Sequence, residues 1–181
     1  MVWALPSPVV VGDEIWIFYV GRNVDHNGDV DAFSKTGRAQ SGLSVAKMRL
    51  DGFVSLTARL HSGSHAAHTV GASGPAWPPE VVTKPLRFAG SRLELNMKTS
   101  GGGSVQVELQ DGASGAAFPG FSLADCVPII VDSVNATVIW NPTWDGKRPN
   151  SDVSALQNHP TGVRVRLQMV GAQLFALQFV Q

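Results

Sequence analysis

The chain has 181 residues, the size of one ordinary domain or of one domain with part of another. Its 14 basic residues balance its 14 acidic residues without any basic cluster, which excludes a strong attraction to nucleic acid. No apolar run approaches the roughly 20 residues of a membrane-spanning helix, so we expect no membrane partner. Only 15% of the residues are charged, whereas Gly (19) and Pro (11) are abundant, which favours many short strands over long helices.

A polar segment at residues 23–40 contains a possible calcium loop. Asp25, Asn27, Asp29 and Asp31 place oxygen ligands at alternate positions, as calcium-binding loops do. The spacing is not that of an EF-hand, because the glycine is at position four and position twelve is not a glutamate. The competing interpretation is a turn in which these short side chains bond to their own backbone. The sequence thus leaves calcium or no cofactor as alternatives.

A second segment, residues 61–79, lacks periodicity and is rich in Ser, Gly, Ala and Pro, so we expect a loop. His61, His65 and His68 have spacings that would suit a metal on a helix, but their small, flexible neighbours favour a loop without metal. Trp77 lies among prolines and is a candidate platform for a sugar ring.

Alternation of polar and apolar residues is strongest in two segments, and each predicts a hairpin. In residues 92–110, a three-residue loop at residues 100–102 would place Leu93 opposite Leu109. Residues 163–179 repeat the pattern around a second three-residue loop. A slip of one residue would turn every apolar side chain to the wrong face, so the apolar pattern sets the expected register.

The expected register of the first hairpin places Glu94 directly opposite Glu108 on the face away from the core. Two carboxylates about 5 Å apart would suit a retaining glycosidase, which needs a nucleophile and an acid–base group. Like charges also occur on solvated sheet faces, where Arg92, Lys98 or Gln106 would relieve the repulsion. We favour this second interpretation and assign no catalytic residue.

Two tryptophans flank a turn at residues 140–144. An exposed Trp144 would stack on a sugar ring, with Asn141 and Asp145 bonding to its hydroxyl groups. Trp140 continues an apolar strand, so a place in the core is the competing interpretation for this residue. A carbohydrate-binding surface and a purely structural turn therefore remain open alternatives.

Together these patterns predict an all-β, antiparallel fold of about nine or more strands, a β-sandwich or jelly roll of the concanavalin-like kind. Only residues 152–157 could form a short helical turn. The other expected strands are residues 14–21, 42–50, 52–58, 80–88, 128–131 and 136–140.

Seven short phrases follow one another along the chain, at residues 6–8, 12–19, 38–46, 49–56, 83–86, 119–123 and 174–179. In this order they resemble the C-terminal part of family 32-like glycoside hydrolases, the β-fructosidase clan, and their bacterial relatives. The resemblance implies that residues 1–50 are the remnant of the last blade of a sugar-hydrolase propeller. It also implies that residues 51–181 are the β-sandwich that follows the propeller.

The catalytic carboxylates of that family lie in phrases such as Asn-Asp-Pro-Asn, Arg-Asp-Pro and Glu-Cys, none of which occurs in this chain. The resemblance therefore transfers no catalytic residue and implies that a propeller domain is missing at the N-terminus. We expect residues 1–50 to join the sheets of the sandwich or to pair with a second copy of the chain, because lone strand pairs are marginal in water. Family relatives are usually exported, which implies an extracellular or periplasmic setting.

The leading hypothesis is an accessory, non-catalytic β-sandwich of a sugar hydrolase with a structural and sugar-contacting role. An independent carbohydrate-binding module is the first alternative. A jelly-roll glycosidase that uses Glu94 and Glu108 is the second.

Overall fold

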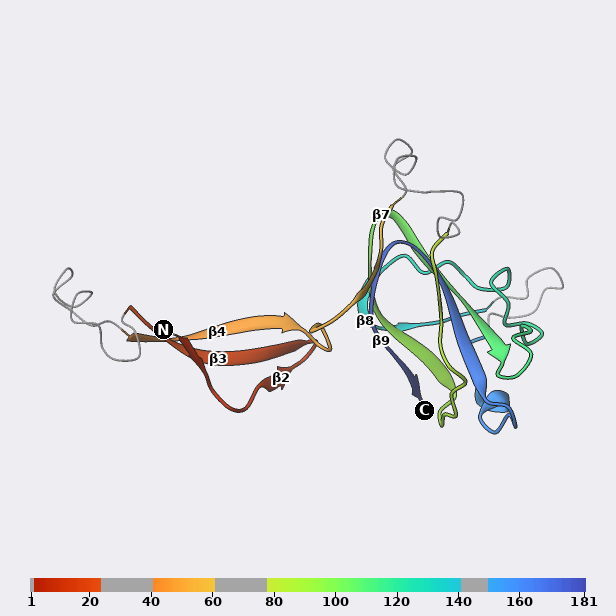
Figure 1. Cartoon of the computed structure of the whole chain (residues 1–181), viewed down its shortest axis with the longest axis horizontal. Coiled ribbons are helices and arrows are strands. Elements are labelled where there is room, and N and C mark those ends of the chain that lie inside the picture. The colour runs from red at the N-terminus through yellow and green to blue at the C-terminus, as the bar shows by residue number, and fades with distance from the viewer. Residues whose placement is uncertain (1, 24–40, 61–77, 141–149) are drawn as a thin grey trace. The chain divides into compact units, whose positions relative to one another are not determined.

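The computed structural model describes residues 2–23, 41–60, 78–140 and 150–181. The chain divides into two compact units, Met1–Phe53 and Val54–Gln181 (Figure 1). All the strand pairings of the described residues are antiparallel, and these residues form nine strands. The predicted all-β, antiparallel fold is thereby confirmed.

The first unit is one sheet with β3 at its centre. On one side of β3, β1 pairs with its C-terminal half and β2 with its N-terminal half. Pro6 and Pro8 separate these two short strands, because proline cannot donate to the ladder. On the other side, β4 pairs with the whole length of β3. The strands are β1 (Val2–Ala4), β2 (Val9–Val11), β3 (Glu14–Arg22) and β4 (Ser41–Arg49).

Both faces of this sheet carry several apolar side chains. Ile15, Ile17 and Tyr19 of β3 share one face, and the register adds Val10 and Met48 to it. The opposite face has an apolar set of its own, which it shares with the charged residues Glu14, Arg22, Lys47 and Arg49. Only Ile15 of the whole sheet is buried. A free-standing antiparallel sheet normally has one apolar and one polar face, so this sheet differs from that pattern. The apolar residues of the second face are Trp3, Val9, Val11, Trp16, Phe18, Val20, Leu43 and Val45.

The second unit is built on two long strands, β7 and β9, which pair with each other along their whole lengths. β8 pairs with the N-terminal half of β7, whereas β5 and β6 pair with different halves of β9. The residues between β8 and β9 include one short 3-10 helix, Ser154–Leu156, inside the predicted helical turn. The strands are β5 (Leu56–Ala58), β6 (Glu80–Val82), β7 (Arg92–Asp111), β8 (Asp132–Thr137) and β9 (Val163–Val180).

The two predicted hairpins are wrong. Leu93 lies opposite Phe179 rather than Leu109, and Val107 lies opposite Leu167. Each segment that alternates therefore forms one continuous strand, and the two segments are partners of each other. The alternation correctly predicts which side chains face the core, but it does not define which strand lies beside them.

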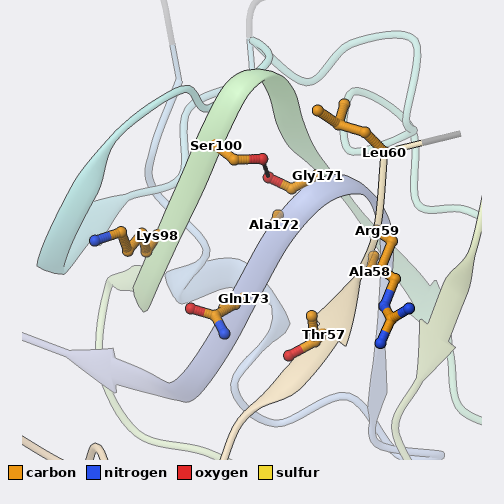
Figure 2. A pocket seen from close by; sticks show the side chains of 9 residues that line it. All are labelled: Thr57, Ala58, Arg59, Leu60, Lys98, Ser100, Gly171, Ala172 and Gln173. Carbon is orange, nitrogen blue, oxygen red and sulfur yellow. Dashed lines mark hydrogen bonds between the residues drawn. The ribbon is translucent and has the colours of Figure 1, made fainter. Parts of the chain in front are cut away.

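The glycines that were expected to form a hairpin loop instead bend the β7–β9 ribbon. Thr99 pairs with Ala172 and Ser104 pairs with Val170, so residues 100–103 of β7 lie opposite Gly171 alone. Gly171 has a positive φ of 50°, a conformation that costs glycine little. Both strands arch over at this point (Figures 1 and 2), and the halves of the ribbon form the two layers of the sandwich.

The core lies between these two layers. Each layer contributes alternate residues of β7 and β9, and these side chains are fully or almost fully buried. Trp140 is also fully buried, and its Nε1–H donates to the Val107 carbonyl oxygen at 2.9 Å. The fully buried residues with the largest side chains are Trp140, Leu93, Leu95, Met97, Leu109 and Leu167.

Candidate functional site

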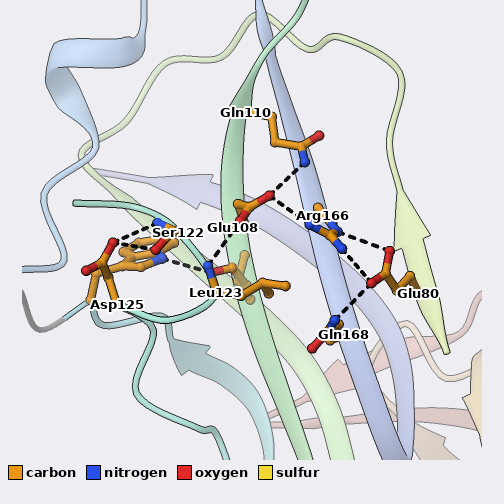
Figure 3. A network of polar contacts seen from close by, with 10 residues as sticks. Glu80, Glu108, Gln110, Ser122, Leu123, Asp125, Arg166 and Gln168 are labelled. Atoms are coloured by element: carbon orange, nitrogen blue, oxygen red, sulfur yellow. Dashed lines mark hydrogen bonds and ion pairs between the residues drawn. The ribbon is translucent and has the colours of Figure 1, made fainter. Parts of the chain in front are cut away.

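A charged network covers the outer face of one layer, where β6, β9 and the C-terminal half of β7 lie side by side (Figure 3). Arg166 of β9 lies between two carboxylates. Its Nη2 atom is 2.6 Å from Oε1 of Glu80 on β6, and its Nη1 atom is 3.1 Å from Oε1 of Glu108 on β7. The Nε–H group adds a second hydrogen bond to Glu80 at 3.1 Å, so this contact is bidentate.

Glu108 is the most enclosed member of the network, with 7% of its surface exposed. Burial is the largest influence on its pKa and opposes ionisation. The hydrogen bonds from Gln110 (2.7 Å), the Leu123 N–H (3.2 Å) and Arg166 outweigh it, so the pKa lies below the ordinary value. Glu108 is thus a carboxylate at neutral pH, with its lone pairs engaged by three donors.

Glu80 is also held ionised. The Arg166 hydrogen bond, followed by that from Gln168 at 2.9 Å, lowers the pKa of Glu80. The same bond raises the pKa of Arg166. A general acid must carry a proton near the operating pH, and neither carboxylate does. This arrangement is suited to fixing three strands together, and it supplies no general acid.

The network also fixes the loop that follows β7. Glu108 accepts from the Leu123 N–H, and Gln106 Nε2 donates to the Leu123 carbonyl oxygen at 3.0 Å. Within the loop, Asp125 Oδ2 accepts from the hydroxyl and the N–H of Ser122, at 2.6 and 3.1 Å. Phe121 of this loop makes an edge contact with Trp140, with ring centroids 5.1 Å apart. The outer network and the core are therefore linked through one loop.

A second polar cluster lies at the end of β7. Asp111 accepts hydrogen bonds from the Ser114 N–H at 2.7 Å, from the Thr161 hydroxyl and from the Ala113 N–H, and these bonds keep its pKa well below the ordinary value. His159 Nδ1 lies 3.0 Å from the Thr161 hydroxyl oxygen. That hydroxyl donates to the carboxylate of Asp111, which is a weak base because its pKa is so low, and it is therefore not activated as a nucleophile. The cluster holds two turns together.

A cavity of about 300 Å³ lies beside the bend of the ribbon (Figure 2). Small residues of the bend, Gly171 and Ala172, form part of its wall. Arg59 and Lys98 lie on different sides of it, and Lys98 Nζ is 3.2 Å from Asp132 Oδ2. The two cations do not converge on one point, so the cavity offers no concentrated positive charge to an anionic ligand.

The predicted pairing of Glu94 with Glu108 is wrong. Glu94 lies opposite Gln178, whose Nε2 is 3.3 Å from Glu94 Oε2, and Glu108 lies opposite Arg166. The two glutamates belong to different halves of β7, and each alternates with buried residues, so they point outward from opposite layers. The core of the sandwich therefore separates them.

Several predicted site residues lie outside the described residues and remain predictions. Among the described residues, no group of three or more His, Cys, Asp or Glu side chains could hold a metal ion. The same part of the chain has no helix that is long and apolar enough to cross a membrane. The predictions that lie outside concern the calcium ligands Asp25, Asn27, Asp29 and Asp31, the histidines at 61, 65 and 68, and the sugar contacts Trp77, Asn141, Trp144 and Asp145.

The sequence did not predict the contact of Arg166 with Glu80. Alternation alone places Arg166 and Gln168 on the outer face of β9, which is a signal that a polar face exists. The partner of that face could not be found, because β6 is separated from β9 by more than 80 residues and no local pattern connects them.

Comparisons with protein-family models, with curated proteins and with solved structures found no match for this chain. The resemblance to family 32-like glycoside hydrolases therefore remains a prediction.

Proposed function

We propose that this chain is a non-catalytic accessory module of a sugar hydrolase, in which the sandwich is a scaffold and the first unit completes a stack of sheets. The observation that carries the proposal is the sheet of the first unit, which presents apolar side chains on both faces. The apolar side chains on both faces of such a sheet are buried when it lies between two other sheets, as a propeller blade does between its neighbours.

The side chains on these faces support an interface of that type. Trp16 and Phe18 of β3 lie on one face with ring centroids 6.4 Å apart, and Val2 and Val10 on the other face are 66% and 61% exposed. Exposed apolar residues that gather in this way mark surfaces that bind other proteins or domains. Covering both faces would bury them and stabilise the sheet.

The chemistry of the sandwich supports a scaffolding role. The Glu108–Arg166–Glu80 network holds both carboxylates ionised and engages them with donors of neighbouring strands. Such a network rigidifies a face and offers no acid–base pair to a glycosidic bond.

A reconstitution experiment tests the proposal. A family 32-like propeller from which the last blade and the sandwich have been removed would be mixed with this chain, and complex formation and fructosidase activity would be measured. We expect a one-to-one complex with recovered activity. The double variant Trp16→Ser, Phe18→Ser should weaken the complex at least about tenfold, because it removes two aromatic anchors. Glu94→Gln, on the sandwich, is the control and should have no effect.

The same preparations distinguish the alternatives. Turnover of a chromogenic glycoside by this chain alone, lost in its own carboxylate variants, would overturn the proposal. Saturable quenching of tryptophan fluorescence by a sugar, without any complex with the propeller, would instead show an independent carbohydrate-binding module.

A further inference from the structure

The outer edge of β4 offers a second type of contact, distinct from the faces of its sheet. Among the described strands, β4 pairs only with β3, over nine residue pairs and without a register shift. Natural edge strands are usually kept short, carry charged side chains such as lysine, or are interrupted by proline, a bulge or an inward charge. β4 carries two charged side chains, Lys47 and Arg49, and both lie in its C-terminal half. β4 has nine residues, no proline and no bulge, and Leu43 on it is 69% exposed.

The direction of the backbone groups along this edge follows from one hydrogen bond. The Leu50 N–H donates to the Asp13 carbonyl oxygen at 2.8 Å, so even-numbered residues of this segment point their backbone groups toward β3. The odd-numbered residues then direct their N–H and C=O groups away from β3. The backbone groups of Leu43, Val45 and Lys47 therefore lie along the outer edge of the sheet.

We propose that the β4 edge pairs with β4 of a second copy of this chain, antiparallel and centred on Val45. This register sets Val45 opposite Val45 of the second copy, Leu43 opposite Lys47 and Ser41 opposite Arg49, and it spans residues 41–49 of both copies. The Arg49 carbonyl oxygen accepts from the Gly52 N–H at 2.9 Å, so the carbonyl groups of Leu43, Val45 and Lys47 are the ones that accept from the second copy. The inference concerns the edge of the sheet and does not rest on the proposed function, which concerns its faces.

Charge and paired length together select this register among those that the backbone permits. Registers centred on Ser44 or Ala46 also keep like charges apart, but each of them pairs seven residues of β4 instead of nine. A shift that centres the pairing on Lys47 would set two lysines directly opposite each other, which is destabilising. A shift that centres it on Leu43 keeps the charges apart but pairs only residues 41–45 of each copy. Centring on Val45 keeps all like charges apart and places the apolar Leu43 against the alkyl stem of Lys47.

A charge-sign experiment tests the register. The molar mass of the full chain would be measured by light scattering from about 5 to about 500 µM, a range that detects weak dimers. Leu43→Lys would place two lysines opposite each other twice in the dimer and should weaken dimerisation about tenfold. Leu43→Glu removes the same apolar side chain but faces Lys47 of the second copy, so it should maintain or strengthen the dimer. Circular dichroism of both variants verifies that the sheet remains folded.

Cross-linking gives a readout that does not depend on affinity. Val45→Cys places its two Cβ atoms about 5 Å apart across the dimer, so a short bifunctional thiol reagent should link the copies. In Leu43→Cys the two thiols lie four residues apart along the strands, about 13 Å, and should not be linked by the same reagent. The native Cys126 is buried and does not compete.

The mass measurements and the cross-linking each test the β4–β4 pairing. A monomer at every concentration, or equal loss of the dimer in Leu43→Lys and Leu43→Glu, would refute pairing in this register. Equal cross-linking of the two cysteine variants would also refute it. A dimer that responds to the sign of the charge and is linked through position 45 would establish the interface.

Discussion

Gly103 lies so close to the Gly171 carbonyl group at the bend of the β7–β9 ribbon that position 103 does not accommodate a side chain. A Cβ atom on Gly103 would lie 2.3 Å from the Gly171 carbonyl oxygen and 2.6 Å from that of Val170. A Cβ atom on Gly171 would lie 2.7 Å from Cγ of Leu60. This close approach lets the ribbon fold over into two layers.

The first prediction concerns the stability effect of alanine at two nearby glycines of the bend. Gly103→Ala should destabilise the sandwich by about 2 kcal/mol or more, because two backbone carbonyl groups would have to move. Gly101→Ala should be neutral or slightly stabilising, since a Cβ atom there meets nothing within 4 Å. Urea unfolding, followed by tryptophan fluorescence, measures both free energies. Equal effects would show that the bend is not as close as described.

A second prediction separates the two glutamates of β7. Glu108→Ala should lower the free energy of unfolding by about 2 kcal/mol, because it leaves the Leu123 N–H and part of Arg166 without their acceptor. Glu94→Ala should cost less than about 0.5 kcal/mol, since Glu94 makes one long hydrogen bond on an exposed face. Chemical denaturation of the two variants provides the comparison, and a larger cost at Glu94 would contradict the network.

A third prediction concerns pH. The pKa values of Glu80 and Glu108 lie below their ordinary value of 4.5 in the folded protein, so near that pH the unfolded chain binds more protons than the folded chain. Their contribution to stability is therefore fully present above about pH 4.5 and is lost as the pH falls through the lowered values. Melting temperatures of the second unit between pH 7 and pH 3 should show this decline. Glu108→Gln should make it shallower, and an unchanged slope would argue against the pairing.

A fourth prediction concerns Cys126. Burial raises the pKa of its thiol to about 11, and its sulfur accepts a hydrogen bond from the Val107 N–H at 3.2 Å. A thiol that is buried and protonated reacts slowly, because the thiolate is the nucleophile. We expect no reaction with a disulfide reagent at pH 8 in the folded protein and complete reaction in denaturant. Rapid labelling of the native protein would show that this side of the core opens.

The sequence by itself determined which side chains face inward. Leu93, Val107 and Leu167 were assigned to the core from alternation, and all three are fully buried. The inward position of Trp140 was also predictable, because it extends an apolar strand. These assignments depend on local periodicity, which is a property of each strand alone.

Only the tertiary structure decided which strands are neighbours. A glycine-rich segment at residues 100–103 is compatible both with a tight hairpin loop and with a bend in a continuous ribbon. The bend allows β7 and β9 to pair along their full lengths. It also turns the apolar face of each half of the ribbon toward one shared core, which a flat hairpin cannot do. The contacts of Glu108 and Arg166 follow from that pairing between distant segments, so no local pattern could have revealed them.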